Sequence, residues 1–261
     1  MSVFVFNYMN HHKRVCIFID GENLRHSIVD LFSDFKEWDY LPKNARWAEL
    51  FDWIVKEVGG ENAERIRTYW YVVQNIDFFP YNLETAQKTE TFLEELLSKD
   101  ETNKKKIQGC KKSDKSTLLK KILDELLKSQ DDMRKRFSWW VGVQDGIART
   151  HKSIEFRRAG AIRYDLFRKS LGSEKAVDVK LATDLIKLKD IYDIAIIISG
   201  DQDYVPAVET IKDYGKHTIN VAFQKEDGKL LPGGARRLNQ TTDWDFEVKH
   251  SDLKKHLFPG E

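Results

Sequence analysis

Apolar and polar residues follow one another along the chain in patterns that predict alternating strands and helices. Residues 15–19 and 193–198 are short, nearly continuous apolar runs, which is the pattern of strands buried on both faces of a parallel sheet. Stretches rich in β-branched and aromatic side chains predict further strands at 65–73, 153–164 and 217–223. The predicted strands are thus spread along nearly the whole chain.

Helical periodicity fills the intervals between these strands. Residues 48–60 and 175–190 repeat their apolar side chains on one helical face, and Gly59-Gly60 gives the first of these segments a stop signal. Residues 204–215 predict a short helix that ends in glycine. Because strands and helices alternate, the predicted class is α/β, with a mostly parallel central sheet between two layers of helices.

The character of the chain changes between residues 82 and 136, which are charged, helix-favouring and marked by leucine pairs. We expect a helical insertion there, folded as a hairpin, with a tip at 104–121 that contains eight lysines and one acidic residue. The expected organisation is an N-terminal tail (1–13), a single domain (14–250) that carries the insertion at about 82–136, and a C-terminal tail (251–261).

Composition changes this picture little. The chain has 261 residues, 41% hydrophobic and 33% charged, and its formal net charge is +1, so overall charge predicts no partner. Cys16 and Cys110 are the only cysteines, and neither lies in a His/Cys cluster. This usage argues against a disulfide scaffold and a zinc site, and it favours a reducing, cytoplasmic location. Neither a signal peptide nor a membrane-spanning stretch is predicted, so no membrane partner is expected.

Four acidic residues lie where the ligands of an open parallel sheet bind, outside the carboxyl ends of the strands. Asp20 follows the first predicted strand, and Asp201 and Asp203 follow the apolar strand "DIAIII". The helix that begins near Asp178 leads back to the start of that strand, so the N-terminus of this helix lies at the same edge. We therefore expect all four carboxylates to converge.

Four carboxylates at one edge repel one another and raise each other's pKa unless a cation intervenes. Mg²⁺ and Mn²⁺ prefer oxygen ligands, and such ions activate water and stabilise the phosphoryl oxygens of an in-line displacement. The pattern therefore favours a divalent metal site that hydrolyses phosphodiester bonds.

Three segments resemble a known family: "FIDGENL", "KAVDVKLATDL" and "SGDQDYVPAV" are similar to the motifs of NYN domains, which are PIN-like ribonucleases that include a LabA-like branch. The resemblance covers the core, roughly 14–80 and 150–223. It implies a PIN-like fold with three layers, helix–sheet–helix, and a metal-dependent endoribonuclease whose partner is RNA and whose cofactor is Mg²⁺ or Mn²⁺.

The resemblance also implies roles for particular residues. Asn23 would orient Asp20, and the Ser199 hydroxyl would polarise the same edge. The residues that match the catalytic and metal-binding positions of the family are Asp20, Asp178, Asp201 and Asp203. One departure from the family pattern is Glu22, which adds a fifth acid next to the site.

Asp184 lies six residues beyond Asp178, about 240° around the helix and about 9 Å along it. The two acids cannot easily bind one ion. Asp184 can instead pair with Lys180 or Lys187 on the flank of the helix. Because the family motif carries an acid here too, Asp184 and Lys180 remain candidates for supporting the site.

The lysine-rich tip has two interpretations. It can be an ordinary solvated surface, or it can contact the phosphate backbone of RNA, which needs charge but no sequence code. The candidate RNA-binding residues are Lys104, Lys105, Lys106, Lys111 and Lys112. The insertion is also a candidate surface for a protein partner or a second copy of the chain.

Each acid taken alone also has a structural explanation. Asp20-Gly21 is a common turn sequence, Asp203 can cap the helix that begins at residue 204, and Asp178 can complement a helix dipole. The metal-site interpretation depends on the three segments taken together.

Other functions stay open at this point. A non-catalytic RNA-binding or scaffold protein can share a nuclease fold, because fold does not imply function; the intact acidic quartet favours an enzyme. A phosphatase of the haloacid dehalogenase type also begins with an aspartate after its first strand, but the residues after Asp20 match it poorly. The pattern does not distinguish a role in RNA processing from one as a toxin or defence effector.

Overall fold

The computed structural model describes residues 12–32, 40–233 and 236–258. The described residues form two compact units. Unit 1 draws on Met1–Val72, Val143–Ala159 and Val177–Glu261, and unit 2 on Val73–Gly142 and Gly160–Ala176. A single nuclease domain that carries an insertion remains a prediction.

The sheet of unit 1 is mostly parallel. Its strands are β1 (Lys13–Asp20), β2 (Ala63–Phe79, which continues into unit 2), β3 (Ile154–Asp165, likewise), β5 (Ile194–Ile198), β6 (His217–Gln224), β7 (Leu230–Leu231) and β8 (Trp244–Lys249). They run in the order β3-β2-β1-β5-β6-β7, and β8 also pairs with β6. The pairs β1–β2, β1–β5, β5–β6 and β6–β8 are parallel, and β6–β7 is antiparallel.

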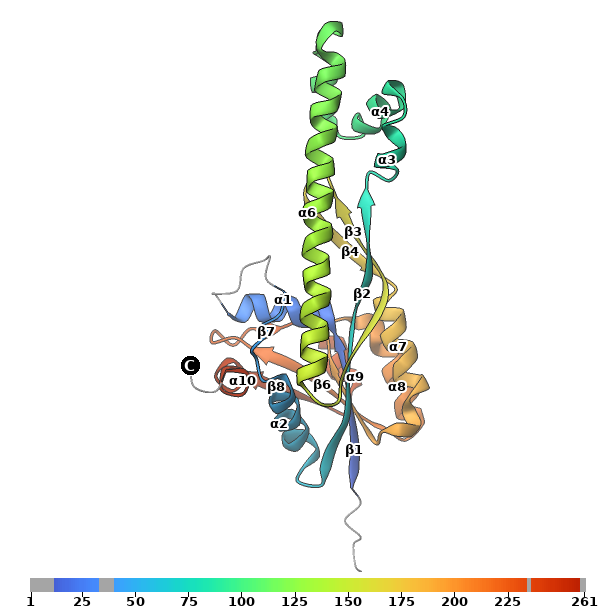
Figure 1. Ribbon diagram of the computed structural model, residues 1–261. Coiled ribbons are helices and arrows are strands. Elements are labelled where there is room, and N and C mark those ends of the chain that lie inside the picture. Colours follow the sequence, from blue (N-terminus) through green and yellow to red (C-terminus); the bar gives the residue numbers. More distant parts are fainter. Residues whose placement is uncertain (1–11, 33–39, 234–235, 259–261) are drawn as a thin grey trace, which may run out of the picture. The chain divides into compact units, whose positions relative to one another are not determined.

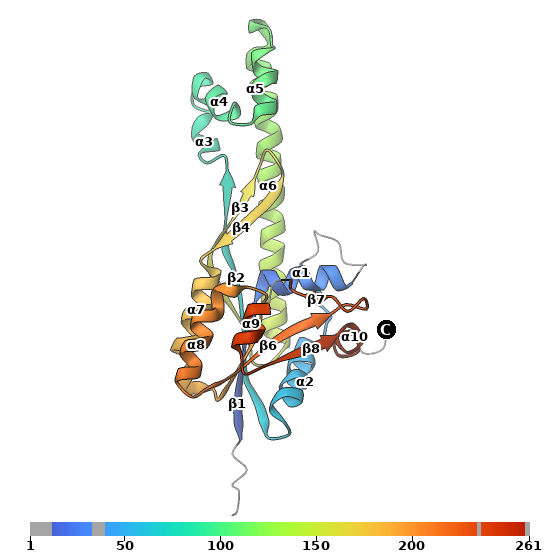
Figure 2. The ribbon, with the colours of Figure 1, turned by 180° about the vertical axis from the view of Figure 1, so that it is seen from behind.

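Helices cover both faces of this sheet. They are α1 (Gly21–Leu31), α2 (Trp47–Gly59), α7 (Val177–Lys187), α8 (Val205–Asp213), α9 (Arg236–Thr241) and α10 (His250–Leu257). Helices α7 and α8 contact each other on one side, and α2 contacts α10 on the other (Figures 1 and 2). The predicted fold class, α/β with a mostly parallel sheet between helix layers, is confirmed.

The centre of unit 1 consists of the two apolar strands predicted to be buried on both faces. Residues 15–19 of β1 and 194–198 of β5 are all at most 2% exposed. Full burial of each Ile or Val contributes about 1.5–3 kcal/mol relative to exposure. Helices α2 and α7 both contact β1. The carboxyl ends of β1 and β5 are therefore fixed points on which polar side chains can be positioned.

The end of the chain is more structured than the sequence predicts. Residues 250–257, expected largely in a tail, form α10, and Leu253 and Leu257 on it are fully buried. Strand β8 adds a further parallel partner beside β6. None of the helices in the described part of the chain is both long enough and apolar enough to span a membrane.

Unit 2 contains the helical segment that follows β2 and one strand that the sequence did not predict. Its elements are α3 (Leu83–Ala86), α4 (Glu90–Leu97), α5 (Glu101–Gln108), α6 (Lys115–Thr150, which continues into unit 1 from Val143), β4 (Ser170–Lys175) and the outer residues of β2 and β3. Strands β3 and β4 pair antiparallel. Three short helices precede one continuous helix of 36 residues, which runs past the expected boundary at 136.

Candidate functional site

Asp20 is held at the end of β1 by the first turn of α1. Its carboxylate caps α1, because Oδ1 accepts a hydrogen bond from the backbone N–H of Asn23 at 3.0 Å. The Asn23 side chain donates to Oδ2 of Asp20 and accepts from the Gly200 N–H at 3.2 Å. The predicted contact between Asn23 and Asp20 is present, and it also ties the end of β1 to the end of β5.

Two hydroxyl groups complete the surroundings of Asp20. Both Ser199 Oγ and the Tyr204 hydroxyl donate to its Oδ2, each at 3.2 Å. The side chain is fully buried, and this burial raises the pKa of Asp20 to about 6. The nearby charge of Asp178 raises it further, whereas the hydrogen bonds from Asn23, Tyr204 and Ser199 lower it.

Asp178, in the first turn of α7, meets Asp20 across the Tyr204 hydroxyl. Tyr204 donates to Oδ1 of Asp178 at 3.0 Å, and carboxylate oxygens of Asp20 and Asp178 lie within 4.8 Å of each other. One hydroxyl has one proton, so it cannot satisfy both carboxylates at once. Burial raises the pKa of Asp178, and the charges of Asp201 and Asp203 raise it further.

Basic side chains do not neutralise this pair. Among the residues that the structure describes, no Lys or Arg forms an ion pair with Asp20 or Asp178. Two buried or half-buried carboxylates therefore face each other with only hydroxyl and amide donors around them. This arrangement is costly when both are ionised, and a cation would relieve that cost.

Glycines allow the chain to pass close to its neighbours at both strand ends. A Cβ atom on Gly21 would lie 2.3 Å from the carbonyl oxygen of Tyr71, and one on Gly200 would lie 2.7 Å from that of Gly233. Both contacts are far shorter than a side chain tolerates. The glycine in each of the sequences "IDG" and "SGD" is thus explained by space rather than by an unusual backbone angle.

Asp201 and Asp203 lie on the more open side of the same edge. Asp201 is half-buried and caps a short 3-10 turn, Gln202–Tyr204, by accepting from the N–H of Asp203 at 2.9 Å. Asp203 is exposed, and Asp201, rather than Asp203, supplies the cap. Within the described chain, neither belongs to the closest group of carboxylates, although both influence the pKa of Asp178.

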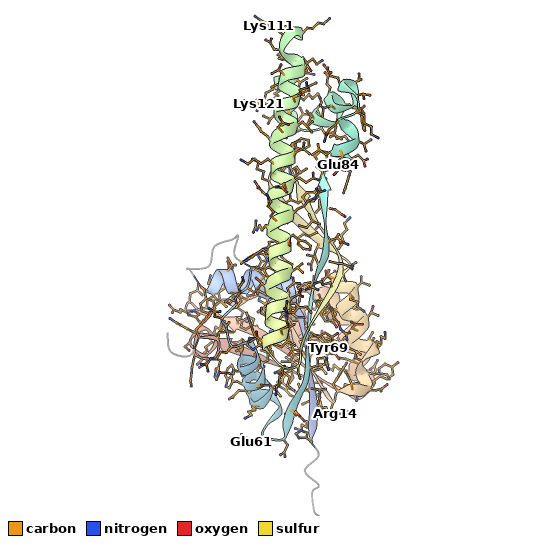
Figure 3. The ribbon with its side chains drawn as sticks, viewed as in Figure 1. Arg14, Glu61, Tyr69, Glu84, Lys111 and Lys121 are labelled. Carbon is orange, nitrogen blue, oxygen red and sulfur yellow. The ribbon has the colours of Figure 1, made fainter. Side chains whose placement is uncertain are left out.

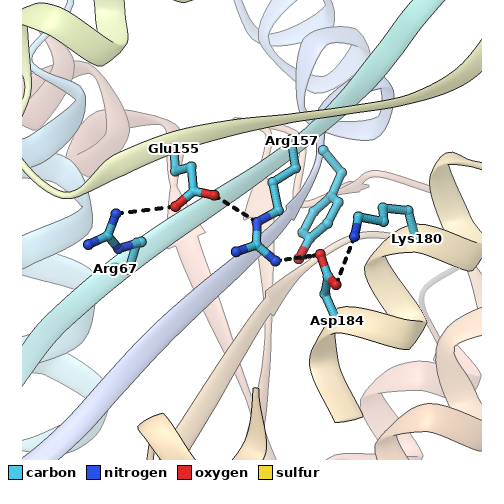
Figure 4. Close-up of polar contacts among 6 residues, drawn as sticks. Arg67, Glu155, Arg157, Lys180 and Asp184 are labelled. Atoms are coloured by element: carbon cyan, nitrogen blue, oxygen red, sulfur yellow. Dashed lines mark hydrogen bonds and ion pairs between the residues drawn. The ribbon is translucent and has the colours of Figure 1, made fainter. Parts of the chain in front are cut away.

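Asp184, two turns along α7, has different surroundings (Figure 4). It is 1% exposed, and its carboxylate receives hydrogen bonds from Lys180 Nζ at 3.0 Å, the Tyr71 hydroxyl at 3.2 Å, and Arg157. Burial works to raise the pKa of Asp184, but the two cations outweigh it and the pKa is lowered. The predicted partner Lys180 is present.

Arg157 belongs to a wider network in Figure 4. Arg157 also pairs with Glu155, and Glu155 in turn pairs with Arg67. The Arg157 guanidinium lies 4.0 Å from the centre of the Tyr69 ring. All these charges are paired with one another. Asp184 therefore anchors α7 to β3, and its ion pairs leave it little capacity to act on a substrate.

Glu22, which the sequence adds as a fifth acid, is engaged elsewhere. Its Oε2 pairs with Arg25 at 2.8 Å. The sequence analysis missed Tyr204, although this aromatic residue directly follows the two acids in the segment "SGDQDYVPAV". It also missed Arg157 and Tyr71, for which no local pattern gives a signal.

The predicted RNA-binding lysines all lie in unit 2 on or beside α5, and all are exposed: Lys104, Lys105, Lys106, Lys111 and Lys112. Figure 3 shows the side chains of Lys111 and Lys121 pointing away from the helices. Lys104 forms one ion pair, with Glu101 at 3.7 Å. The cluster is exposed as predicted, and its role in binding RNA remains a prediction.

The fold is mixed α/β, and Asp20, Asp178, Asp201 and Asp203 lie at one edge of its sheet. The chain matches the NYN domain family over residues 90–231, more than half of its length, and it belongs to this family. The matched range includes Asp178, Asp201 and Asp203, whereas Asp20 lies before it. No curated protein is significantly similar to the chain.

Among solved structures, the chain is similar to the crystal structure of a protein of unknown function from Vibrio parahaemolyticus. The two share 13% sequence identity over 91% of this chain and 94% of that chain, with a TM-score of 0.42. No statement about the function of this chain follows from that similarity.

The donors at the edge suit a hard divalent cation. They are carboxylate oxygens from two different elements, with no Cys or His in the group that contains Asp20 and Asp178. Oxygen donors of this kind select Mg²⁺ or Mn²⁺ over softer ions. Burial is the main cause of the raised pKa of both acids and the charges of neighbouring carboxylates add to it, and a bound cation would favour the ionised form of each.

Proposed function

We propose that the chain is a ribonuclease that depends on Mg²⁺ or Mn²⁺ and cleaves phosphodiester bonds within RNA. The NYN domain family is generally a family of nucleases. The observation that carries the finer proposal is the Asp20–Tyr204–Asp178 arrangement, in which one hydroxyl lies between two carboxylates that have no cationic partner among the described residues. A carboxylate with a structural role has cationic partners, as Asp184 does. Asp20 and Asp178 have hydroxyl and amide donors instead.

The metal would be held by Asp20 and Asp178, with Asp201 and Asp203 contributing from the open side of the edge, directly or through water. When bound, the ion would lower the pKa of a water molecule and stabilise charge on the phosphate. Asn23 fixes the rotamer of Asp20, because it is itself held by the Gly200 N–H. Ser199 links the same edge by donating to Asp20 and accepting from the N–H of Asp201 at 3.0 Å.

The test compares the cleavage of a circular RNA with that of a linear RNA labelled at its 5′ end, in Mn²⁺, Mg²⁺ or EDTA. Only an endonuclease cuts the circle. We expect metal-dependent cleavage of both by the wild type, and cleavage slowed by about 10²–10³ in Asp178→Asn. The matched control is Asp213→Asn, which removes an exposed acid at the end of α8.

Cleavage that is equal in wild type and Asp178→Asn, or that persists in EDTA, would overturn the proposal. Binding of RNA without cleavage by the wild type would instead favour the non-catalytic RNA-binding protein that the sequence leaves open. Calorimetric titration with Mn²⁺ measures metal binding directly, so it shows whether the metal site exists even when no cleavage is seen.

The exposed lysines of unit 2 would contact the phosphate backbone of the same RNA. Replacing Lys104, Lys105, Lys106, Lys111 and Lys112 by Gln should weaken binding and flatten its dependence on salt, while cleavage of a saturating short RNA stays unchanged. A matched variant replaces five exposed lysines of unit 1, which are Lys56, Lys187, Lys229, Lys254 and Lys255. Equal salt dependence in both variants would show that the cluster is only a solvated surface.

A further inference from the structure

Unit 2 has a pocket of about 620 Å³ on the outer part of the β3–β4 hairpin, beside the end of β2. Strand alternation places Ala161, Arg163 and Asp165 on the same face of β3, while Ile162 and Tyr164 between them are buried on the other. The small residues Gly172 and Ser173 of β4 also line it. An open face lined by polar and small residues leaves room for a flat ligand.

Aromatic rings form one wall of this pocket. The Arg163 guanidinium lies 4.1 Å from the centre of the Phe79 ring and 5.9 Å from that of Tyr81. The Phe79 and Tyr81 rings meet edge to face with centres 5.9 Å apart. Tyr81 is nevertheless 53% exposed, so much of its surface remains accessible to a ligand. Exposed aromatic rings and arginine planes are the surfaces on which unpaired nucleic acid bases stack.

Three cations surround the same pocket: Arg163, Arg168 and Lys175. All three are exposed, and within the described chain none of them forms an ion pair. Two acids, Asp77 and Asp165, also line it, and Oδ1 of Asp165 accepts from the N–H groups of Phe167 and Arg168 at 2.9 and 3.0 Å. The lining cations therefore outnumber the acids by one. Because Arg163 lies over the Phe79 ring, Arg168 and Lys175 are the cations left to contact phosphate groups of a bound strand.

We propose that this pocket binds a single-stranded segment of RNA, with a base stacked on Tyr81 and phosphates contacted by Arg168 and Lys175. Duplex RNA would not fit this chemistry, because its base faces are already covered by stacking. The inference rests on the proposed function in one respect, since it takes RNA as the ligand. It does not depend on the carboxylates of unit 1.

The stacking contact is tested in the full-length chain that carries Asp178→Asn, which keeps the RNA intact. The probe is a fluorescein-labelled oligouridylate of eight nucleotides, followed by anisotropy. Tyr81→Ala should weaken binding about 5- to 100-fold, whereas Tyr81→Phe, which keeps the ring, should bind within about two-fold of its parent. Tyr214→Ala is the matched control, because Tyr214 is a tyrosine of unit 1 that is 56% exposed.

The phosphate contacts are tested by the salt dependence of the same binding. The plot of log K against log salt has a negative slope, to which each phosphate contact with a single strand contributes about 0.7. Arg168→Ala combined with Lys175→Ala should therefore make this slope less steep by about 1.4. Lys254→Ala combined with Lys255→Ala, in α10, should leave the slope unchanged.

Three results would each overturn the proposed RNA-binding role of this pocket. The first is equal binding by Tyr81→Ala and Tyr214→Ala, and the second is an unchanged salt slope in the Arg168/Lys175 variant. The third is that polyglutamate competes with the labelled RNA as well as unlabelled oligouridylate does. Failure of the proposed function is distinguishable from this, because it appears as absent cleavage in the wild type and leaves the binding results intact. Conversely, wild-type cleavage with no effect of Tyr81→Ala on binding would remove the pocket alone.

Discussion

Helix α7 carries two acids with contrasting surroundings. Asp178 and Asp184 each accept a hydrogen bond from a tyrosine hydroxyl, Tyr204 for the first and Tyr71 for the second. Asp184 also has two cations within hydrogen-bond distance, and its pKa is lowered. Asp178 has a second carboxylate nearby instead, and its pKa is raised. The same residue type on one helix thus serves stability at one end and leaves a charge uncompensated at the other.

The contrast shows which acid is engaged structurally. Burial of a charge is tolerated when partners compensate it, and such a group supports the fold. An uncompensated pair such as Asp178 and Asp20 disfavours the folded state whenever both are ionised, so its presence points to a role outside stability. Each of the following predictions separates these two kinds of carboxylate.

The largest effect is expected on RNA cleavage. Asp178→Asn should lower the rate constant at saturating Mn²⁺ by about 10²–10³, the usual loss when a preorganised electrostatic contact is removed. Asp184→Asn should cleave at nearly the wild-type rate per folded molecule, because Asp184 is engaged with Arg157 and Lys180. Single-turnover cleavage of a labelled RNA measures both. If both variants lost cleavage rate to a similar extent, Asp178 and Asp184 would not differ in function.

The second prediction concerns the free energy of unfolding. Asp184→Asn removes the carboxylate that pairs with Arg157 and Lys180, while Arg157, which is 19% exposed, keeps Glu155, so the change should cost about 2 kcal/mol. Asp178→Asn removes a repulsive charge, and should leave the metal-free protein as stable as the wild type or more so. Urea unfolding in EDTA at neutral pH measures the two variants side by side. A stability loss in Asp178→Asn as large as that in Asp184→Asn would contradict the assignment.

The third prediction concerns the pH dependence of stability, which has opposite signs for Asp20 and Asp184. Asp20 has a folded-state pKa of about 6 against an ordinary value of 3.8, so the folded state holds its proton more tightly. Its contribution is therefore favourable at low pH and is lost as pH rises from about 4 to about 6, a change of about 2–3 kcal/mol. Asp184, whose pKa is lowered, contributes stability above its unfolded pKa and loses it as pH falls.

Urea unfolding of metal-free wild type, Asp20→Asn and Asp184→Asn between pH 3 and pH 7 measures both trends. The difference between wild type and Asp20→Asn should follow the Asp20 titration, and saturating Mn²⁺ should reverse the trend in the wild type, because the metal needs ionised carboxylates. A difference curve for Asp20→Asn that is flat from pH 4 to pH 6 would show that the folded state does not raise the pKa of Asp20.

Much of this site could be predicted because its supports are local. The apolar runs of β1 and β5 identify their own ends, and an acid directly after such a run lies at the edge of the sheet. The position of Asp178 followed from the connection of its helix to β5. For Asp20 and Asp178 the predicted proximity is observed, through Tyr204.

The contacts that separate the two kinds of acid could not be predicted, because they join residues far apart in the chain. Arg157 reaches Asp184 from β3, and Tyr71 reaches it from β2. Neither residue type nor period reveals such partners. The helix α10 escaped prediction for a related reason: it is short and polar apart from its leucines, and its burial depends on contact with α2.

The smallest effects, and the most specific, are expected from removing the two tyrosine hydroxyls one at a time. Tyr71→Phe takes one hydrogen bond from Asp184, which keeps Arg157 and Lys180. It should cost about 1 kcal/mol in stability and leave Mn²⁺ affinity unchanged. Tyr204→Phe removes the hydroxyl that lies within hydrogen-bond distance of both Asp20 and Asp178.

Supporting hydrogen bonds around a metal site are worth about 10-fold to 100-fold in affinity or activity, and because Ser199 and Asn23 still hold Asp20, Tyr204→Phe should weaken Mn²⁺ binding by about 10-fold. Its stability in EDTA should change by less than about 1 kcal/mol, since repulsion between the carboxylates opposes the lost bond. Calorimetric titration with Mn²⁺ and urea unfolding, run on both variants, give four values. If Tyr71→Phe weakens Mn²⁺ binding as much as Tyr204→Phe does, Asp184 and Asp178 belong to one coupled site, and the separation between an acid that supports the fold and an acid that binds the metal fails.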